Sequence, residues 1–180
     1  IIVDLAGVDL SGMNLQKVNF SRVDLRGVDL ADANLVGANL IRAYLFQADL
    51  NRANLSRAIL REAFLYEATF DGARLYRTNF SGSRARKANF KVAVLVSSIF
   101  GFIDLSEADG LEEAFHRNFS TVGTDTLYLS KGKIPDKFLR GCGLSDWEIE
   151  SARIYNPELS NNEINQILYK MYEIRAQQPL

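Results

Sequence analysis

Residues 33–57 read ANLVG ANLIR AYLFQ ADLNR ANLSR, so one five-residue unit occurs five times in succession. The third residue of the unit is Leu or Phe at every fifth position from Leu5 to Leu105, with the single exception of Ala85. The first residue is also restricted, to Val or Met up to Val28 and then to Ala from residue 33 to residue 73. A period of five fits neither an α-helix nor a flat strand. It indicates a coiled backbone in which two of every five residues face inward.

The unit repeats twenty-one times, from Val3 to Glu107, without a shift of register and without proline. A repeat this regular is first of all a structural feature. The phrases Ala33–Gly37 and Ala53–Arg57 resemble the A(D/N)LxX unit of the pentapeptide-repeat proteins. The resemblance implies an all-β solenoid, a right-handed quadrilateral parallel β-helix in which four pentads form one coil. The chain then has about five coils, stacked about 4.8 Å apart.

We expect two domains, a pentapeptide-repeat β-helix at residues 1–107 and a C-terminal α-helical cap and connector at residues 108–180. A solenoid that ended in water would expose its core and an unpaired strand edge, so it needs a cap. Leu111, Phe115 and Phe119 have helical spacing and are predicted to lie across the open end.

Three further helices are predicted from their start signals. Pro135 stands in the first turn of a short helix that has Gly141 just past its end, and capping boxes open two helices at Ser145 and Ser160. The last helix has an apolar face, which either packs on the cap or forms a dimer contact. This face consists of Ile164, Ile167, Leu168, Met171 and Tyr172.

A second resemblance covers three short segments, Gly123–Tyr128, Lys131–Pro135 and Phe138–Gly143. They are similar to the connector of bacterial pentapeptide-repeat proteins that continue into a TIR domain. The resemblance implies that this chain is the N-terminal part of a longer protein, whose Toll/interleukin-1 receptor-like module begins near Leu180. The NAD-cleaving glutamate of TIR domains has no matching position in this sequence.

The composition indicates a cytoplasmic protein without a membrane segment. The chain has 21 Lys and Arg against 22 Asp and Glu, no signal-like start, and no apolar stretch of 18 residues. Its one cysteine, Cys142, excludes an internal disulfide, and we expect it to be a small buried side chain. Residues 1–107 contain 13 basic and 11 acidic residues, and residues 108–180 contain 8 and 11.

Nothing in the sequence predicts an enzyme, a cofactor or a metal site. There is no glycine-rich phosphate loop and no His, Cys and carboxylate cluster at metal-ligand spacing. Aspartates such as Asp4 and Asp24 recur at one place in the pentad, where they are expected to bond to turn amides. His116, the only histidine, is assigned a surface or capping role.

Partner binding is predicted on one side of the coil, where large side chains replace the usual polar ones. Pentads twenty residues apart stack on each other, which places four aromatic residues beside two arginines. Such a patch is typical of a contact surface. The rings are alternatively an intramolecular ladder, with Arg86 stacked on Tyr66. The predicted site consists of Tyr44, Phe46, Phe64, Tyr66, Arg84 and Arg86.

Three functions remain open from the sequence. The first is a non-catalytic scaffold for protein interaction or oligomerisation that positions the TIR-type domain. The second is DNA mimicry, as in pentapeptide-repeat proteins that protect type II topoisomerase, although the net charge of +2 in residues 1–107 disfavours it. The third is an enzyme with a site near His116, Lys131 and Cys142. No nucleic-acid partner is expected, because the most basic stretch, Arg84–Lys87, is short.

Overall fold

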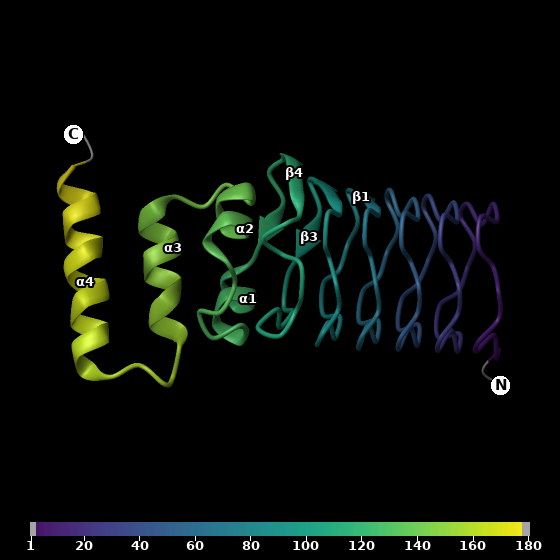
Figure 1. The fold of residues 1–180 in the computed structure, drawn as a ribbon, viewed down its shortest axis with the longest axis horizontal. Helices are drawn as coiled ribbons and strands as arrows, with labels where there is room; N and C mark the ends of the chain where they lie inside the picture. Colours follow the sequence, from purple (N-terminus) through teal and green to yellow (C-terminus); the bar gives the residue numbers. More distant parts are fainter. Residues whose placement is uncertain (1–2, 178–180) are drawn as a thin grey trace.

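The structure is a computed structural model that describes residues 3–177. Its two parts lie along one axis. Stacked coils begin at the N-terminal end and helices continue them, so residues 3 and 177 lie far apart (Figure 1).

Parallel backbone pairing joins residues that are twenty apart in the repeat. Asp24 pairs with Tyr44 and Asn34 with Asn54, and the same relation extends from Asp4 to the Asn89–Asp109 bridge. Four such pairings occur in each turn of the chain, so each coil has four sides. The right-handed β-helix predicted from the repeat is confirmed.

We name the four sides walls A to D. Wall A contains residues 3–7 and the pentads that begin every twenty residues after it, through residues 103–107. Walls B, C and D begin with residues 8–12, 13–17 and 18–22 and repeat in the same way, through residue 102. Walls that follow each other in this order are adjacent, and wall D is adjacent to wall A.

Each pentad from residue 3 to residue 102 ends in a corner residue with a left-handed backbone, even where it is not glycine. The φ angle is 57° at Arg42 and 61° at Arg57. Such a conformation costs about 1–2 kcal/mol for a non-glycine residue, and it persists because bonds between coils hold it, such as Arg42 N to Arg61 O at 3.0 Å. The predicted turn bonds are confirmed, since Asp29 Oδ1 accepts the amide hydrogen of Ala31 at 2.9 Å.

The core is a column of central Leu and Phe side chains that are fully excluded from solvent from Leu25 onward. In the later coils phenylalanines form two ladders. Phe70 stacks on Phe90 from wall B, and Phe80 stacks on Phe100 from wall D, each with ring centroids 5.2 Å apart. The ladders meet edge to face across the interior, with Phe80 and Phe90 5.7 Å apart.

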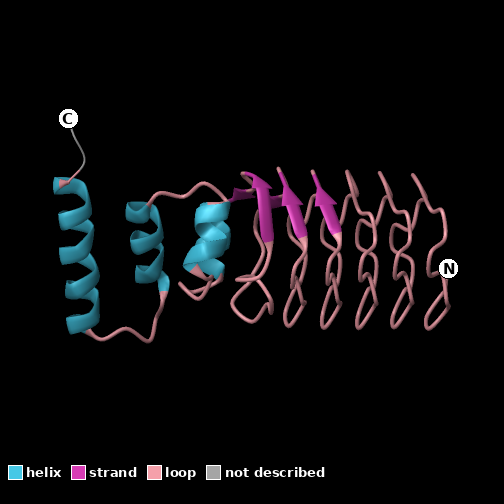
Figure 2. Ribbon diagram, turned by 45° about the horizontal axis from the view of Figure 1, so that its top comes forward, coloured by secondary structure: helices cyan, strands magenta, loops and turns pink. Residues whose placement is uncertain are grey.

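Short parallel strands appear where the solenoid approaches the helices (Figure 2). On wall C, β1 (Arg74–Tyr76), β2 (Val94–Val96) and β4 (Phe115–Asn118) form one sheet in that order. On wall D, β3 (Ile99–Phe100) pairs with β5 (Thr121–Val122). Parallel pairing therefore continues beyond the last regular pentad.

The helix predicted from the spacing of Leu111, Phe115 and Phe119 is wrong. Leu111 is buried, but the other two side chains are exposed, and the segment between them is strand β4. The free edge of β2 offers hydrogen-bond partners to this segment, and pairing there outweighs a weak helical pattern. One extra residue shifts the register, so that His116 lies opposite Leu95 at a central, inward position.

Helices occupy the rest of the described chain. They are α1 (Thr124–Leu129), α2 (Asp136–Gly141), α3 (Asp146–Ala152), the 3₁₀ turn η1 (Arg153–Tyr155) and α4 (Asn161–Ala176).

Both predicted capping boxes are confirmed. Ser145 Oγ accepts the amide hydrogen of Glu148 at 3.3 Å, and Glu148 Oε2 accepts the amide hydrogen of Ser145 at 2.7 Å. Ser160 and Glu163 repeat this arrangement at the start of α4. These hydrogen bonds lower the pKa of both glutamates, so the carboxylates stay charged and hold the helix starts.

The short helix predicted near Pro135 is also confirmed, with a different end. Pro135 is the N-cap residue, and Gly141 is the last residue of α2 rather than the residue past it. The left-handed glycine that follows the helix is Gly143, with φ of 90°.

α1 and α2 cover the C-terminal end of the solenoid. Thr126 Oγ1 accepts the amide hydrogen of Ile103 at 3.2 Å and donates to the carbonyl of Phe100 at 2.8 Å, so one side chain satisfies two backbone groups of the last coil. Phe138 of α2 packs edge to face on Phe100, with centroids 5.5 Å apart. The helical cover therefore extends the phenylalanine ladder.

α4 lies farthest from the solenoid and packs against α3. Of its predicted apolar face, Ile167 is buried and Met171 half-buried, whereas Leu168 and Tyr172 are exposed. The prediction that the whole face packs on the cap is therefore only partly right.

No helix among residues 3–177 combines the length and the apolar character that crossing a bilayer requires.

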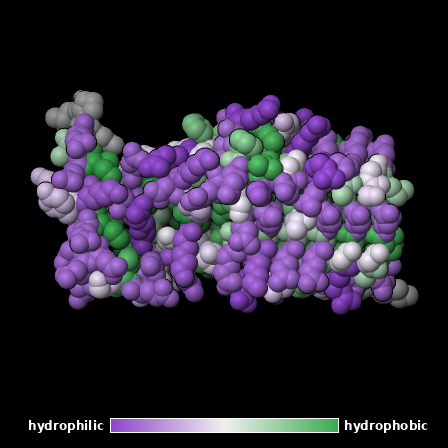
Figure 3. Space-filling model, in the orientation of Figure 1, coloured by the Kyte–Doolittle hydropathy of each residue, from purple (hydrophilic) through white to green (hydrophobic). Residues whose placement is uncertain are grey.

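At the opposite end, the first coil exposes inward-type side chains, including Val3 and Met13. Figure 3 shows apolar side chains at that end, whereas the side of the solenoid in view is largely hydrophilic.

Candidate functional site

The aromatic residues predicted to bind a partner lie together on wall A. The rings of Tyr44 and Phe64 stack with centroids 4.9 Å apart and only 2° between their planes. Phe46 lies 5.8 Å from Phe64 and 6.5 Å from Tyr44. Tyr66 follows on the same wall, one coil after Phe46. All four side chains are half-buried, and the rings of Tyr44, Phe46 and Phe64 cover one another. The ladder expected as the alternative is therefore present, and its outer side remains open.

This stack interrupts the turn chemistry of the repeat. On either side of the stack along wall A, Asp24 and Asp104 accept the turn amide two residues ahead, at 3.2 and 2.8 Å. Between them the same position holds Tyr44, Phe64 and Arg84, whose side chains have no carboxylate or amide oxygen to offer. Three turn bonds, each contributing about 0.5–1.5 kcal/mol, are absent in a row. In place of these three hydrogen bonds, the side chains of Tyr44, Phe64 and Arg84 stack on one another.

Arg84 continues the stack as a cation. Its guanidinium carbon lies 4.9 Å from the centroid of the Phe64 ring. Beside it, a groove of about 380 Å³ runs between the stack and the corner of walls D and A. Arg22, Arg42 and Glu62 line the far side of this groove. The aromatic surface is thus bordered by more positive than negative charge.

Arg86 has a different contact from the predicted one. Its Nε donates to Glu107 Oε2 at 2.8 Å, and this hydrogen bond raises the pKa of Arg86. The cation over Tyr66 is Lys87, whose Nζ lies 6.0 Å from the ring centroid. The predicted stacking of Arg86 on Tyr66 is therefore wrong, because a carboxylate within reach binds the guanidinium more strongly than a ring face does.

The three residues of the enzyme hypothesis do not form a site. Burial raises the pKa of Cys142 to about 12, so its thiol is not a nucleophile at neutral pH. Both nitrogens of His116 are buried without a hydrogen-bond partner, and its ring contacts Phe138 edge to face at 4.9 Å. Lys131 is exposed. No cluster of three or more His, Cys, Asp or Glu suited to a metal ion occurs among residues 3–177.

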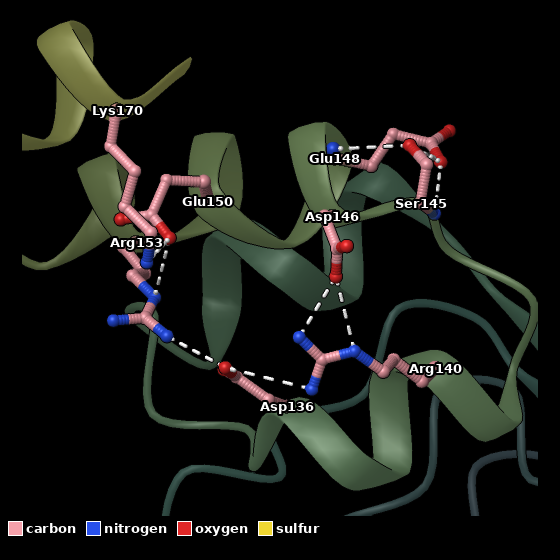
Figure 4. Close-up of polar contacts among 8 residues, drawn as sticks. All are labelled: Asp136, Arg140, Ser145, Asp146, Glu148, Glu150, Arg153 and Lys170. Carbon is pink, nitrogen blue, oxygen red and sulfur yellow. Dashed lines mark hydrogen bonds and ion pairs between the residues drawn. The ribbon is translucent and has the colours of Figure 1, made fainter. Parts of the chain in front are cut away.

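A network of charged side chains joins α2, α3 and α4, which the sequence pattern did not reveal (Figure 4). Glu150 is only 5% exposed and accepts from Lys170 Nζ at 2.8 Å, which links α3 to α4. Arg153 lies between Glu150, at 3.6 Å, and Asp136, at 2.7 Å. The i, i+3 spacing of Glu150 and Arg153 was a visible signal, whereas Lys170 is twenty residues away from its partner. The network holds α4 on the cap.

The comparisons with known proteins agree with the fold. The family model for pentapeptide repeats matches residues 4–40, 38–75 and 73–109. These segments cover more than half of the chain, which therefore belongs to the pentapeptide repeat family. None of the curated proteins compared with the chain matches it.

Several solved structures are similar. Rfr23, a pentapeptide repeat protein from the cyanobacterium Cyanothece 51142, is 26% identical, with a TM-score of 0.50 over 66% of this chain and 87% of its own. A pentapeptide repeat protein of the Arabidopsis thaliana thylakoid lumen is 34% identical, with a TM-score of 0.27 over 51% of this chain and 68% of its own. HetL from Nostoc sp. strain PCC 7120, involved in heterocyst differentiation regulation, is 33% identical, with a TM-score of 0.30 over 65% and 63%.

Proposed function

We propose that this chain is a non-catalytic scaffold for protein interaction, and that the stack on wall A is its partner-binding surface. The observation that carries the proposal is the run of three departures from the repeat at Tyr44, Phe64 and Arg84. Packing of the core does not require them, because all three side chains point outward. Aromatic and Arg side chains are also the residues that most often anchor protein interfaces.

We further propose that residues 108–180 connect this scaffold to a C-terminal TIR-type signalling domain in the full-length protein. The similarity of residues 123–143 to the connectors of such proteins supports this role. The order of the elements supports it too, since α3 and α4 lead away from the solenoid along its axis. In this arrangement the solenoid binds its partner while the connector sets the position of the signalling module.

DNA mimicry is the less favoured function. A protein that imitates a duplex needs a continuous acidic surface along the solenoid. Here the middle of wall A is occupied by Tyr44, Phe46, Phe64 and Tyr66 and by basic side chains at residues 84–87.

The test is the solution mass of the chain, measured by light scattering over a concentration series. The decisive variant replaces the stack: Tyr44→Ser, Phe46→Ser, Phe64→Ser and Tyr66→Ser. If the stack is a self-association surface, the wild-type chain forms oligomers and this variant is monomeric while still folded by circular dichroism. The Leu168→Ser, Tyr172→Ser variant is the matched control, because it removes exposed apolar side chains from α4 instead.

Loss of association only in the α4 control would contradict the assignment to wall A. Equal masses for the wild type and the stack variant would show that the rings do not mediate self-association. The stack then either binds a different protein or only stabilises the coil. The four substitutions in the full-length protein distinguish these roles, because unchanged signalling output would mean that the stack only stabilises the coil.

A further inference from the structure

The fold sorts the charges of the repeat by wall, although their sum is close to zero. Walls C and D together carry seven Lys or Arg residues and a single acid, Glu62. Walls A and B carry six basic and ten acidic residues. The two halves of the solenoid surface therefore have net charges of +6 and −4.

The positive charge is concentrated at the corner between walls C and D. Arg57 and Arg77 occupy the corner itself in consecutive coils. Arg74 lies in the middle of wall C, and Arg61 lies on wall D next to Glu62, the residue of the following corner. All four side chains are exposed, and none of them forms an ion pair with a residue of the described chain, 3–177. By contrast, four of the six basic residues on walls A and B have a carboxylate partner.

An unpaired cluster of like charges is unfavourable for the isolated protein, since the guanidinium groups repel one another. The repeat does not require arginine at these places: glycine occupies the same corner position at Gly37. The cluster therefore favours an anionic partner.

Wall B supplies the complementary surface on the same molecule. Asp9, Asp29 and Asp49 occupy one position in three consecutive coils, and each fixes its turn through Oδ1. Asp71 lies one coil further along the wall. None of these four carboxylates forms an ion pair with another residue of the described chain. Ala31, beside Asp29, is small. The wall also carries Arg52, which is paired with Asp32, and Lys91, so its net charge is −3.

The spacing of the charges favours a second copy of this chain over a nucleic acid. Stacked coils are about 4.8 Å apart, and this period separates Arg57 from Arg77 just as it separates Asp29 from Asp49. Two solenoids that lie side by side therefore keep their charges in step over several coils. Phosphates along one DNA strand rise by about 3.4 Å per nucleotide, which does not match this period.

We propose that copies of this chain associate side by side, with the arginine cluster at the C–D corner of one copy docked on wall B of the next. This inference deepens the scaffold function proposed above by naming a second copy as a partner and walls B, C and D as the contact. The contact is heterologous, because the two copies contribute different surfaces. Each copy keeps one free surface of each kind, so the assembly grows beyond a dimer.

The experiment uses two charge-reversal variants and measures mass by light scattering at 50 mM and 500 mM NaCl. One variant, Arg57→Glu with Arg77→Glu, reverses the arginine cluster. The other, Ala31→Lys with Asp71→Lys, changes the net charge of wall B from −3 to zero and leaves the turn-fixing aspartates in place. The control, Lys131→Glu with Lys133→Glu, changes the net charge as much as the first variant does, at exposed residues outside the solenoid.

We expect the wild type and the control to associate at low salt and to dissociate at high salt. Each variant alone should associate at least about tenfold more weakly, because the first places glutamates opposite the aspartates of wall B and the second removes the net negative charge of wall B. An equimolar mixture of the two variants should associate, because the intact arginine cluster of the second variant can dock on the intact wall B of the first. Mixed species of two or more chains, formed where each variant alone associates weakly, identify the contact, since the introduced Glu and Lys side chains are also complementary to each other.

A wild type that stays monomeric at 50 mM NaCl, or a mixture of the two variants that stays monomeric, overturns the proposal. Binding of duplex DNA or of anionic vesicles by a monomeric wild type would assign the arginine cluster to those partners instead. The variant with four Ser substitutions on wall A should still associate. Its failure to do so, with the charge reversals harmless, would support the stack as the interface and reject walls B, C and D.

Discussion

Replacing Gly141 by alanine should destabilise the protein, although the general rule for helices predicts the opposite. Alanine is more favourable than glycine within a helix by about 1 kcal/mol, and Gly141 belongs to α2. A Cβ at this position, however, would overlap the Cγ and Cδ2 atoms of His116. That ring is packed on Phe138 at 4.9 Å and lies between the last coil and the helical cover, so it has little room to move.

Excess volume in a packed interior costs typically about 1–3 kcal/mol. The gain in helix propensity offsets about 1 kcal/mol of this, which leaves a net loss of up to about 2 kcal/mol. The assay is urea unfolding followed by circular dichroism for four proteins: wild type, Gly141→Ala, His116→Ala and the double variant. In the His116→Ala background the new methyl group has space, so Gly141→Ala should become neutral or stabilising, with a coupling of about 1 kcal/mol or more. Equal effects of Gly141→Ala in both backgrounds would refute the steric reasoning.

Three further predictions concern the core, the pH dependence and the cap. Leu65→Ala should lower the free energy of unfolding by about 2–5 kcal/mol, because Leu65 is fully buried; the same change at the half-buried Leu5 should cost much less, and equal urea midpoints would contradict this. Burial lowers the pKa of His116 from 6.5, so the unfolded chain takes up a proton more readily than the folded one. The free energy of unfolding should therefore be constant above about pH 7 and fall as the pH drops through 6.5, and a pH titration of His116→Leu should lack this component. Ser160→Ala should cost about 0.5–2 kcal/mol and accelerate amide hydrogen exchange in α4, whereas unchanged exchange would mean that the capping box does not hold the helix.

The sequence was sufficient for the features that depend on local or strictly periodic information. The pentad period determines which residues face inward, and the step of twenty residues then follows from four sides per coil. Capping boxes are equally local, since the side chains of Ser145 and Glu148 each accept the backbone amide hydrogen of the other residue, whatever surrounds them. These predictions were correct because nothing distant in the chain competes with them.

The segment after the last pentad was predicted wrongly because its structure depends on a distant partner. Leu111, Phe115 and Phe119 have helical spacing, but the amide of Phe115 donates to the carbonyl of Ala93 at 2.9 Å on the free edge of the previous coil. A signal was available: His116 stands twenty-one residues after Leu95, which is one residue more than a coil. A search for the inward position that allowed one inserted residue would have placed His116 opposite Leu95, at an inward position.

The arrangement of charge shows why total composition is a weak guide to the partners of a solenoid. In a coil of twenty residues, a residue's position in the sequence already assigns it to a wall, so two walls can be basic although the net charge of the whole chain is only −1. The sum of +2 over residues 1–107 argues against a uniformly acidic DNA mimic, and it says nothing about the arginines gathered at the corner of walls C and D. Charges sorted in this way steer the orientation in which two molecules meet, because opposite faces attract and like faces repel. For this protein the relevant quantity is therefore the charge of each wall, and it favours association in one orientation, with a basic wall of one copy on an acidic wall of another.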